Sequence, residues 1–292
     1  MNRTTMLLLG FLPFLYLSSF FLISAASVDI TAHLVYVGGS GEGNYSQIQD
    51  ALDMVAPGGT VYVFPGTYHE NLRITTPIHL IGDDKNTTVI DGQNKEFVII
   101  LEAGNSTLSG FMITHSELKF PFAGVYVCSN QNTISNNIIT DNYYGMQLGY
   151  SASYNLIVNN SIYHNRQCGI YFNHASHNRL IGNTVFDHQV NGFGLYEFSN
   201  NNSILENTFS GNRDTGVNIR ESYDNLVANN RFIQGHVALH KPAPEYHSLA
   251  QDNLFSDNVV SVEEERDAFV LTVVIFDVLV FSVFLAFRKF MI

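Results

Sequence analysis

The sequence predicts an all-β protein, a right-handed single-stranded parallel β-helix with an N-terminal capping helix, followed by one C-terminal transmembrane α-helix. Three observations predict this fold. Asparagine recurs at a nearly constant interval, short segments that open with glycine alternate between apolar and polar residues, and a long apolar stretch lies near the C-terminus. Regular repeats of roughly 20–50 residues are typical of solenoids, in which each repeat packs only on its neighbours.

Two series of asparagines define the repeat. Successive members of the second series are 23, 23, 24, 23 and 23 residues apart. The first series lies five residues earlier and comprises Asn132, Asn155, Asn178, Asn202 and Asn225, and the second comprises Asn137, Asn160, Asn183, Asn207, Asn230 and Asn253. Segments that recur in one direction pair in parallel, and the crossover rule makes the coil right-handed. Because neighbouring coils lie about 4.8 Å apart, we expect these asparagines to stack and hydrogen-bond from coil to coil.

A strand is expected before each asparagine unit. Alternation in period two places one set of side chains inside the solenoid and the other outside. These strands begin at Gly124, Gly145, Gly169, Gly192 and Gly216, and their outward positions are Tyr126, Gln147, Tyr171, Gly194 and Asn218. The competing solenoid is a leucine-rich repeat, which would need a leucine-dominated consensus and a helix or 3₁₀ turn in each repeat. Asparagine and β-branched residues dominate here instead.

The N-terminal part divides into residues 1–26, a signal peptide, residues 27–59, a strand and capping helix, and residues 60–262, the β-helix. An uncleaved N-terminal anchor is the alternative to the signal peptide. The helix is expected over residues 45–55, where apolar side chains share one face, and it should cover the apolar core and strand edge of the first coil. The expected first strand of the coil is 60–64, followed by a turn at 65–68 and strands near 78–81, 88–90 and 98–101.

The C-terminal part divides into an acidic linker, residues 263–267, a transmembrane helix, residues 268–287, and a cytoplasmic tail, residues 288–292. About 20 apolar residues span the hydrocarbon core of a bilayer, and the basic flank belongs in the cytoplasm. We therefore expect a single-pass protein of the cell membrane whose bulk is extracellular or periplasmic. Asp277, at the centre of the span, predicts a membrane partner or self-association, and the alternative is a protonated aspartate tolerated by the helix.

The charge balance and the cysteine count limit the partners and the covalent framework. The chain has 14 Lys and Arg against 26 Asp and Glu, a formal net charge of −12, which argues against nucleic acid as a partner. The two cysteines, Cys128 and Cys168, lie about two coils apart, too far for a disulfide. We expect both to be buried free thiols.

Several short motifs resemble a known family. They are IQDAL at 48–52, GGTVYV at 58–63, PGTYHE at 65–70, LIG at 80–82 and VIDG at 89–92. They resemble the N-terminal module of NosD-like and related carbohydrate-binding and sugar-hydrolase (CASH) β-helix proteins, which have the pectin-lyase-like fold, and the resemblance covers about residues 36–260. The matching residues are turn and core positions, so they indicate the fold more strongly than an activity.

The outward face of the glycine strands is one candidate site. Enzymes of this fold that cleave pectin use clustered acids with Arg or Lys on the outer face of one sheet, and the outward positions given above contain no acid. Tyr126 and Tyr171 could offer flat faces to a sugar ring, or they could reflect ordinary strand propensity.

A polar corner is the second candidate site. The fourth residue after the second-series asparagine is Asp141, His164 and Asp187 in three successive coils. If the register holds, the histidine lies about 5 Å from each carboxylate, and the carboxylate spacing is near the upper end for inverting glycoside hydrolysis. Further ligand contacts in the neighbouring turns would be Arg166, His188, Arg213 and Asp214. The alternative is a solvated turn rich in Asp, His and Asn.

Histidines are the candidate metal ligands. His174 and His177 could bind a metal ion, with His236, His240 and His247 further along the chain. The NosD resemblance implies copper, and calcium is the other ion considered, but no Cys or Met completes a soft-metal ligand set. The residue pattern by itself predicts no cofactor.

The leading interpretation is an exported, membrane-tethered β-helix that binds a glycan or another cell-envelope component without catalysis. The first alternative is a polysaccharide hydrolase, lyase or epimerase that uses the polar corner. The second, which the resemblance implies, is a NosD-like accessory protein for maturation of an exported copper enzyme.

Overall fold

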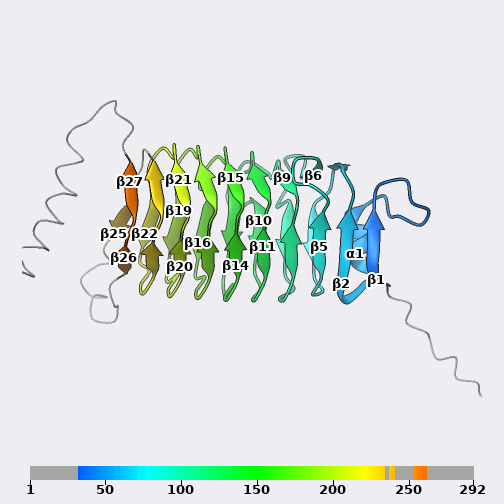
Figure 1. The fold of residues 1–292 in the computed structure, drawn as a ribbon, viewed down its shortest axis with the longest axis horizontal. Coiled ribbons are helices and arrows are strands. Elements are labelled where there is room, and N and C mark those ends of the chain that lie inside the picture. The colour runs from blue at the N-terminus through cyan, green and yellow to red at the C-terminus, as the bar shows by residue number, and fades with distance from the viewer. Residues whose placement is uncertain (1–31, 234–236, 241–252, 262–292) are drawn as a thin grey trace, which may run out of the picture. The chain divides into compact units, whose positions relative to one another are not determined.

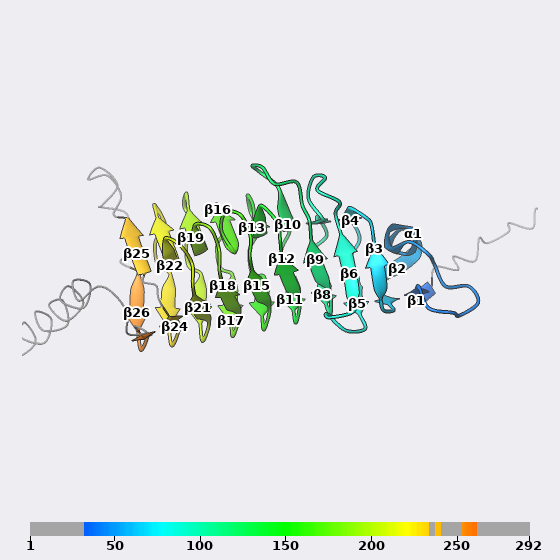
Figure 2. The same ribbon diagram turned by 90° about the horizontal axis from the view of Figure 1, so that it is seen from above.

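The structure is a computed structural model that describes residues 32–233, 237–240 and 253–261. These residues form a right-handed parallel β-solenoid of about 9 turns with almost no helix, so the expected solenoid is confirmed. Figures 1 and 2 show the strands of successive turns side by side along one axis. Within the described ranges, no helix is long and apolar enough to cross a bilayer. The segments predicted as signal peptide, acidic linker, membrane span with Asp277, and tail lie outside those ranges.

Three parallel sheets, here named A, B and C, make up the solenoid. The strands of sheet A are β1 Ala32–Val37, β2 Val55–Val63, β5 His79–Gly82, β8 Thr107–Ser109, β11 Thr133–Ser135, β14 Leu156–Val158, β17 Arg179–Ile181, β20 Ser203–Leu205, β23 Leu226–Ala228 and β26 Leu254–Ser256. The strands of sheet B are β3 Gly66–Tyr68, β6 Thr88–Asp91, β9 Met112–Thr114, β12 Ile138–Thr140, β15 Ser161–Tyr163, β18 Thr184–Phe186, β21 Thr208–Ser210, β24 Arg231–Ile233 and β27 Val259–Ser261. The strands of sheet C are β4 Leu72–Ile74, β7 Ile99–Leu101, β10 Ala123–Val127, β13 Tyr144–Leu148, β16 Ile170–Asn173, β19 Asn191–Tyr196, β22 Thr215–Arg220 and β25 Val237–His240.

The core is a set of apolar columns that run from coil to coil. On sheet A, Ile134 pairs with Ile157, which pairs with Leu180, and all three are completely buried. Equivalent columns line sheets B and C, where each strand also contributes inward side chains at alternate positions. Full burial of one such side chain stabilises the fold by roughly 1.5–3 kcal/mol, so a continuous column compensates for the shortness of each strand.

The first two corners of each coil contain the asparagine ladders. Asn132 donates from its backbone N and its Nδ2 to Asn155 Oδ1, at 2.9 and 3.0 Å. Asn137 makes the same pair of bonds to Asn160 Oδ1, at 3.0 and 3.2 Å. Both ladders repeat these bonds coil by coil, and their asparagines are at most 1% exposed from Asn132 to Asn230. Each asparagine therefore connects two coils and fixes their register.

A third ladder occupies the corner between sheets B and C. Asn142 N donates to Asn165 Oδ1 at 3.0 Å, and Asn165 N donates to His188 Nδ1 at 3.2 Å. His188 N in turn donates to Asn212 Oδ1 at 3.3 Å. The His188 ring thus takes the place of an asparagine amide, and its Nε2 lies 3.1 Å from the carbonyl oxygen of Ile162. The structure places His188 inside the corner at 2% exposure, which corrects its expected place in a surface groove.

The glycines that open or adjoin the sheet C strands make room for this third ladder. A Cβ at Gly145 would lie 2.5 Å from the carbonyl oxygen of Gly169 and 2.8 Å from Asn165 Nδ2. A Cβ at Gly124 would meet Asn142 Nδ2 at 2.7 Å in the same way. These glycines are needed because the next coil and the ladder side chain pass too close for a methyl group.

Replacing Gly145 with alanine is therefore expected to lower the free energy of unfolding by about 1–3 kcal/mol, because overpacking a rigid corner forces backbone shifts. Urea denaturation followed by circular dichroism checks this. Gly66→Ala is the matched control, since a Cβ there would lie 3.4 Å from the nearest atom of the Tyr68 ring, an ordinary contact. Equal losses in the two variants would contradict the steric explanation.

A short helix, α1 Ile48–Met54, caps the first coil at the end of sheet C (Figures 1 and 2). Ile48 N and Gln49 N donate to the two carboxylate oxygens of Glu70, at 2.7 and 2.9 Å. The Gln49 side chain bonds to both the backbone N and the backbone O of Arg73 in β4, so it covers that strand edge. Ile48, Ala51 and Leu52 are buried against the core, as expected for a cap.

Three local expectations near the cap are corrected. The helix begins at Ile48 and not at 45, because Glu70 from the next turn receives its first N–H groups. The segment 60–64 is not the first strand of the solenoid. Residues 60–63 form the end of the longer β2, and β2 pairs with the earlier strand β1. The predicted turn at 65–68 is wrong, since Gly66–Tyr68 is β3 and pairs with β6.

Candidate functional site

The polar corner of Asp141, His164 and Asp187 is only partly assembled. His164 Nε2 lies 3.8 Å from Asp187 Oδ2, and both side chains are more than half exposed. Asp141 Oδ2 instead accepts a hydrogen bond from the hydroxyl of its neighbour Thr140 at 2.9 Å. All three residues have positive φ, between 54° and 57°, and Gly211 takes the equivalent place in the next coil with φ 60°. Because Asp and His tolerate the left-handed region better than most residues, the turn itself explains this choice of residues.

The other predicted ligand contacts of that corner do not converge on it. Arg166 Nη1 donates to the carbonyl oxygen of Leu118 at 3.1 Å. Arg213 and Asp214 are exposed in the equivalent turn of a later coil. His188 is buried, and burial lowers the pKa of its imidazole to about 4. The corner therefore presents one exposed His–Asp pair.

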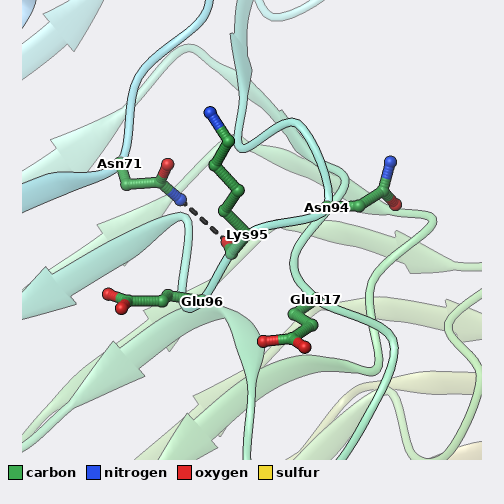
Figure 3. Close-up of a pocket in the computed structure, with 5 residues that line it drawn as sticks. All are labelled: Asn71, Asn94, Lys95, Glu96 and Glu117. Carbon is green, nitrogen blue, oxygen red and sulfur yellow. Dashed lines mark hydrogen bonds between the residues drawn. The ribbon is translucent and has the colours of Figure 1, made fainter.

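A shallow hollow lies in an earlier part of the same edge of the solenoid. Its lining residues are Asn71, Asn94, Lys95, Glu96 and Glu117. Asn71 Nδ2 donates to the backbone oxygen of Lys95 at 2.9 Å, while the amine of Lys95 and the carboxylates of Glu96 and Glu117 point in different directions (Figure 3). Because these charged groups do not meet at one point, the hollow has no arrangement for catalysis or metal binding.

The outer face of sheet C carries stacked aromatic rings. Tyr171 lies between Tyr144 and Tyr196, with ring centroids 4.7 and 5.2 Å away and nearly parallel planes. Tyr126 stacks on Phe97 at 4.8 Å. Because rings from the two neighbouring coils stack on both of its faces, Tyr171 has no free face for a sugar. Burial raises the pKa of the Tyr144 and Tyr196 phenols, so these hydroxyls stay neutral hydrogen-bonding groups.

The same face contains polar atoms without partners. Gln147, which pairs in register with Tyr126 and Tyr171, is 9% exposed, and its Oε1 is buried without a hydrogen bond. Asn218 Oδ1, further along the same row of outward residues, is also buried without a hydrogen bond. An unpaired buried acceptor costs about 1–3 kcal/mol, and in a native structure it calls for an explanation such as a ligand or water.

Exposed aromatic rings lie at the corner between sheets C and A, whereas the tyrosine rings on the face of sheet C are covered by stacking. The Tyr150 ring stacks on the His174 ring at 4.2 Å, and Tyr154 stacks on His177 at 5.1 Å with an interplanar angle of 7°. Tyr150 is 69% exposed, Tyr154 63% and Phe198 49%. We call Tyr150, Tyr154, His174, His177 and Phe198 the aromatic corner.

A hydrogen-bonded network joins the aromatic corner to the face of sheet C. Asn173 Nδ2 donates to the Tyr171 hydroxyl at 3.3 Å and to Glu197 Oε2 at 3.0 Å. Asn173 Oδ1 lies 2.7 Å from His174 Nδ1, which is also 3.8 Å from Glu197 Oε2. Face and corner therefore form one continuous surface of phenol, amide and imidazole groups.

Sequence reasoning missed Tyr150, Tyr154 and Phe198. A signal existed for one pair, because Tyr154 and His177 each come directly before an asparagine of the first series, at the same point of successive coils. These residues lie in the turn that connects sheets C and A, which the strand alternation does not describe. Only its backbone geometry shows that these rings stand outside the solenoid and stack.

The described residues do not fit a metal site. No group of three or more His, Cys, Asp or Glu side chains in them is arranged to hold an ion. The rings of His174 and His177 are stacked on tyrosines and do not share a ligand position. Asp91 lies between two histidines: its Oδ2 is 3.5 Å from His69 Nδ1, and its Oδ1 is 3.0 Å from His115 Nδ1. These carboxylate contacts leave neither Nδ1 atom free to bind a metal ion. His236 and His247 lie outside the described residues, and for His240 only the backbone is described.

The two cysteines are free thiols. Cys168 is buried as expected, and burial raises the pKa of its thiol to about 11. Cys128 is only half-buried, which corrects the expectation that both thiols would be inside. It follows β10 at the point where the chain leaves sheet C, so its side chain is not part of the core columns.

Comparison with known proteins gives a family and a fold. A family model described as "Periplasmic copper-binding protein (NosD)" matches residues 83–271. No curated protein matches the sequence. The solenoid resembles pectin methylesterase from carrot, with TM-score 0.61 and 11% identity over 80% of this chain and 84% of that one. It also resembles the pectin methylesterase of Aspergillus niger, with TM-score 0.55 and 14% identity over 81% and 88% of the two chains. The catalytic domain of a GH87 α-1,3-glucanase gives TM-score 0.52 and 15% identity over 78% of this chain and 45% of that one. At these identities the likeness shows the pectin-lyase-like fold alone.

Proposed function

The chain belongs to the NosD family, and from that premise we propose that it is a glycan-binding β-helix on the outer side of a membrane that works without catalysis. The family's description as periplasmic supports the location. A membrane anchor over residues 268–287, and a membrane partner or self-association at Asp277, are part of the same proposal. The observation that carries the binding role is the aromatic corner beside the hydrogen-bonding face of sheet C.

The aromatic corner has the properties of a sugar-binding platform. The apolar C–H face of a pyranose ring packs on a flat aromatic ring, and its hydroxyls need hydrogen-bond partners close by. Tyr150 and Tyr154 are each supported from one side by a histidine ring, which leaves much of the tyrosine exposed and holds it in place. A side chain that is already ordered loses little entropy on binding, so the affinity gained per contact is larger.

The direction of the coils favours an extended ligand. Neighbouring coils are about 4.8 Å apart, which is close to the length of one pyranose unit in an extended polysaccharide. The network from Tyr171 through Asn173 to Glu197 connects two coils in this direction. A glycan lying along the solenoid axis would therefore meet similar groups at each sugar unit.

The distribution of carboxylates supports binding over catalysis. Glycoside hydrolysis generally needs two carboxyl groups roughly 5–9.5 Å apart on either side of the scissile bond. The strands β7, β10, β13, β16 and β19 contain no carboxylate, and the carboxylate that joins the network of the aromatic corner is Glu197. Asp141 and Asp187 lie at the corner between sheets B and C, across sheet C from the exposed tyrosines.

Copper is named in the family description, but we derive no copper chemistry for this chain because the described side chains offer no fitting ligand set. The accessory role in maturing an exported copper enzyme has no described residue in its favour. The glycan role is therefore the one supported by geometry.

Removing the two exposed tyrosines is expected to weaken glycan binding. The full chain, purified in detergent, is screened on a glycan array and titrated calorimetrically with cellohexaose, laminarihexaose and mannohexaose. Each of Tyr150→Ala and Tyr154→Ala should weaken the Kd about three- to tenfold, since an aromatic contact contributes about 0.5–1.5 kcal/mol. Phe120→Ala is the control, because this ring is 65% exposed in the loop between β9 and β10. Unchanged affinity in both tyrosine variants, or no binding to any glycan, would overturn the proposal.

A further inference from the structure

The ionisable groups around the binding face are unevenly distributed. Five consecutive strands of sheet C, β7, β10, β13, β16 and β19, contain no Lys, Arg, Asp or Glu. Their outward groups are phenols and amides, together with glycine and, in β7, Ile100. The cations at the two ends of this stretch are already paired, Arg73 of β4 with Glu102 and Arg220 of β22 with Glu221.

The charged groups at the two edges of the face differ. On the side of the aromatic corner the charged group in the network is the carboxylate of Glu197. On the opposite side, at the corner between sheets B and C, Lys119 is paired with Glu117, whereas Arg166 and the exposed Arg213 keep their charge. The chain as a whole has a formal net charge of −12.

Resting on the proposed function, we infer that the ligand is an uncharged glycan and not a polyuronate. A polyuronate brings one carboxylate for each sugar unit. Moving such a group out of water onto a face without cations carries a desolvation penalty that no ion pair offsets. Repulsion from Glu197 and from the net negative charge adds to this penalty at low salt.

Calorimetric titration of the full chain at pH 7.5 tests the inference. The probes are cellohexaose, laminarihexaose and mannohexaose as neutral glycans, and hexagalacturonate and a hexamannuronate as acidic ones. At least one neutral hexasaccharide should bind about tenfold more tightly than either uronate, and the difference should shrink as salt screens the charges. Tighter or equal binding of a uronate overturns the inference while leaving glycan binding intact. Binding of neither class overturns the proposed function, and the inference falls with it.

A charge-reversal variant provides a second measurement. Glu197→Lys puts a cation beside the aromatic corner and should strengthen hexagalacturonate binding about fivefold at low salt, as expected for one short-range charge pair in water. Glu42→Lys, an exposed position before α1, makes the same change in net charge away from the face and should have little effect. If both variants bind hexagalacturonate equally, the charge at the corner does not select the ligand and the inference is wrong.

Discussion

Replacing Asn160 with alanine is expected to lower the free energy of unfolding by about 3–5 kcal/mol, a loss typical of broken buried networks. Asn160 is 1% exposed and lies in the middle of the second ladder. Its Oδ1 accepts from the backbone N and the Nδ2 of Asn137, and its Nδ2 donates to the carbonyl of Ile134 at 2.9 Å and to Asn183 Oδ1 at 3.0 Å. Alanine would leave the buried N–H of Asn137 and the carbonyl of Ile134 without these bonds.

Urea denaturation of the full chain, followed by far-UV circular dichroism, measures this loss, which should appear as a lower midpoint. Asn159→Gly is the control in the adjacent position. Asn159 is exposed and has φ 55°, a conformation that glycine adopts without strain, so the variant should stay within about 0.5 kcal/mol of the wild type. A loss of less than about 1 kcal/mol for Asn160→Ala would show that the ladder sets register without contributing to stability.

The repeat period alone was enough to predict the solenoid, because a fixed interval in sequence becomes a fixed position in the coil. It placed Asn132, Asn137 and their successors as far as Asn230 at two corners before any contact was known. It was wrong for Asn253, which was expected in the second series: Asn253 Oδ1 accepts from Asn225 and so continues the first ladder, and Asn258 continues the second, because the last turn is longer than the others. The third ladder follows the same arithmetic, five residues after the second series, yet it was missed. His188 interrupts its asparagines, and the neighbouring Asp141, His164 and Asp187 suggested chemistry where the turn required a positive φ.

The candidate site was less predictable for a physical reason. Alternation along a strand tells which side chains point outward, and it correctly placed Tyr126 and Tyr171 on the outer face of sheet C. It does not tell which rings stack on one another. The stacking partners Tyr144 and Tyr196 are not in register with Tyr171 in their strands, and together they cover both faces of its ring. Ring exposure at Tyr150 depends on turn geometry, which has no simple period.

His188 makes the stability of the solenoid depend on pH. The buried ring accepts a hydrogen bond at Nδ1 from Asn165, so the fold requires its neutral form. Burial is the main cause that lowers the pKa of the imidazole to about 4, and nearby His164 acts in the same direction, while the contact of Nε2 with the carbonyl oxygen of Ile162 partly opposes it. In the unfolded chain the histidine titrates near its ordinary pKa of about 6.5. The unfolded state therefore takes up a proton first as pH falls, and stability declines between about pH 6.5 and 4.

Replacing His188 with asparagine is expected to remove this decline. Asn142, Asn165 and Asn212 already occupy equivalent positions, so the variant should keep the ladder and stay close to wild-type stability above pH 7. Between pH 7 and pH 4 the variant should gain about 3 kcal/mol over the wild type, which is the linkage of a pKa lowered by about 2.5 units. Urea denaturation of both proteins at several pH values measures the difference in their free energies of unfolding. The carboxylates are the same in both proteins, so their titration cancels in this difference. His177→Asn is the control: it changes an exposed histidine at the corner between sheets C and A, away from His188, and its φ of 61° is one that asparagine tolerates, so it should follow the wild-type pH profile. Parallel profiles for wild type and His188→Asn would mean that the ring accepts a proton inside the folded corner.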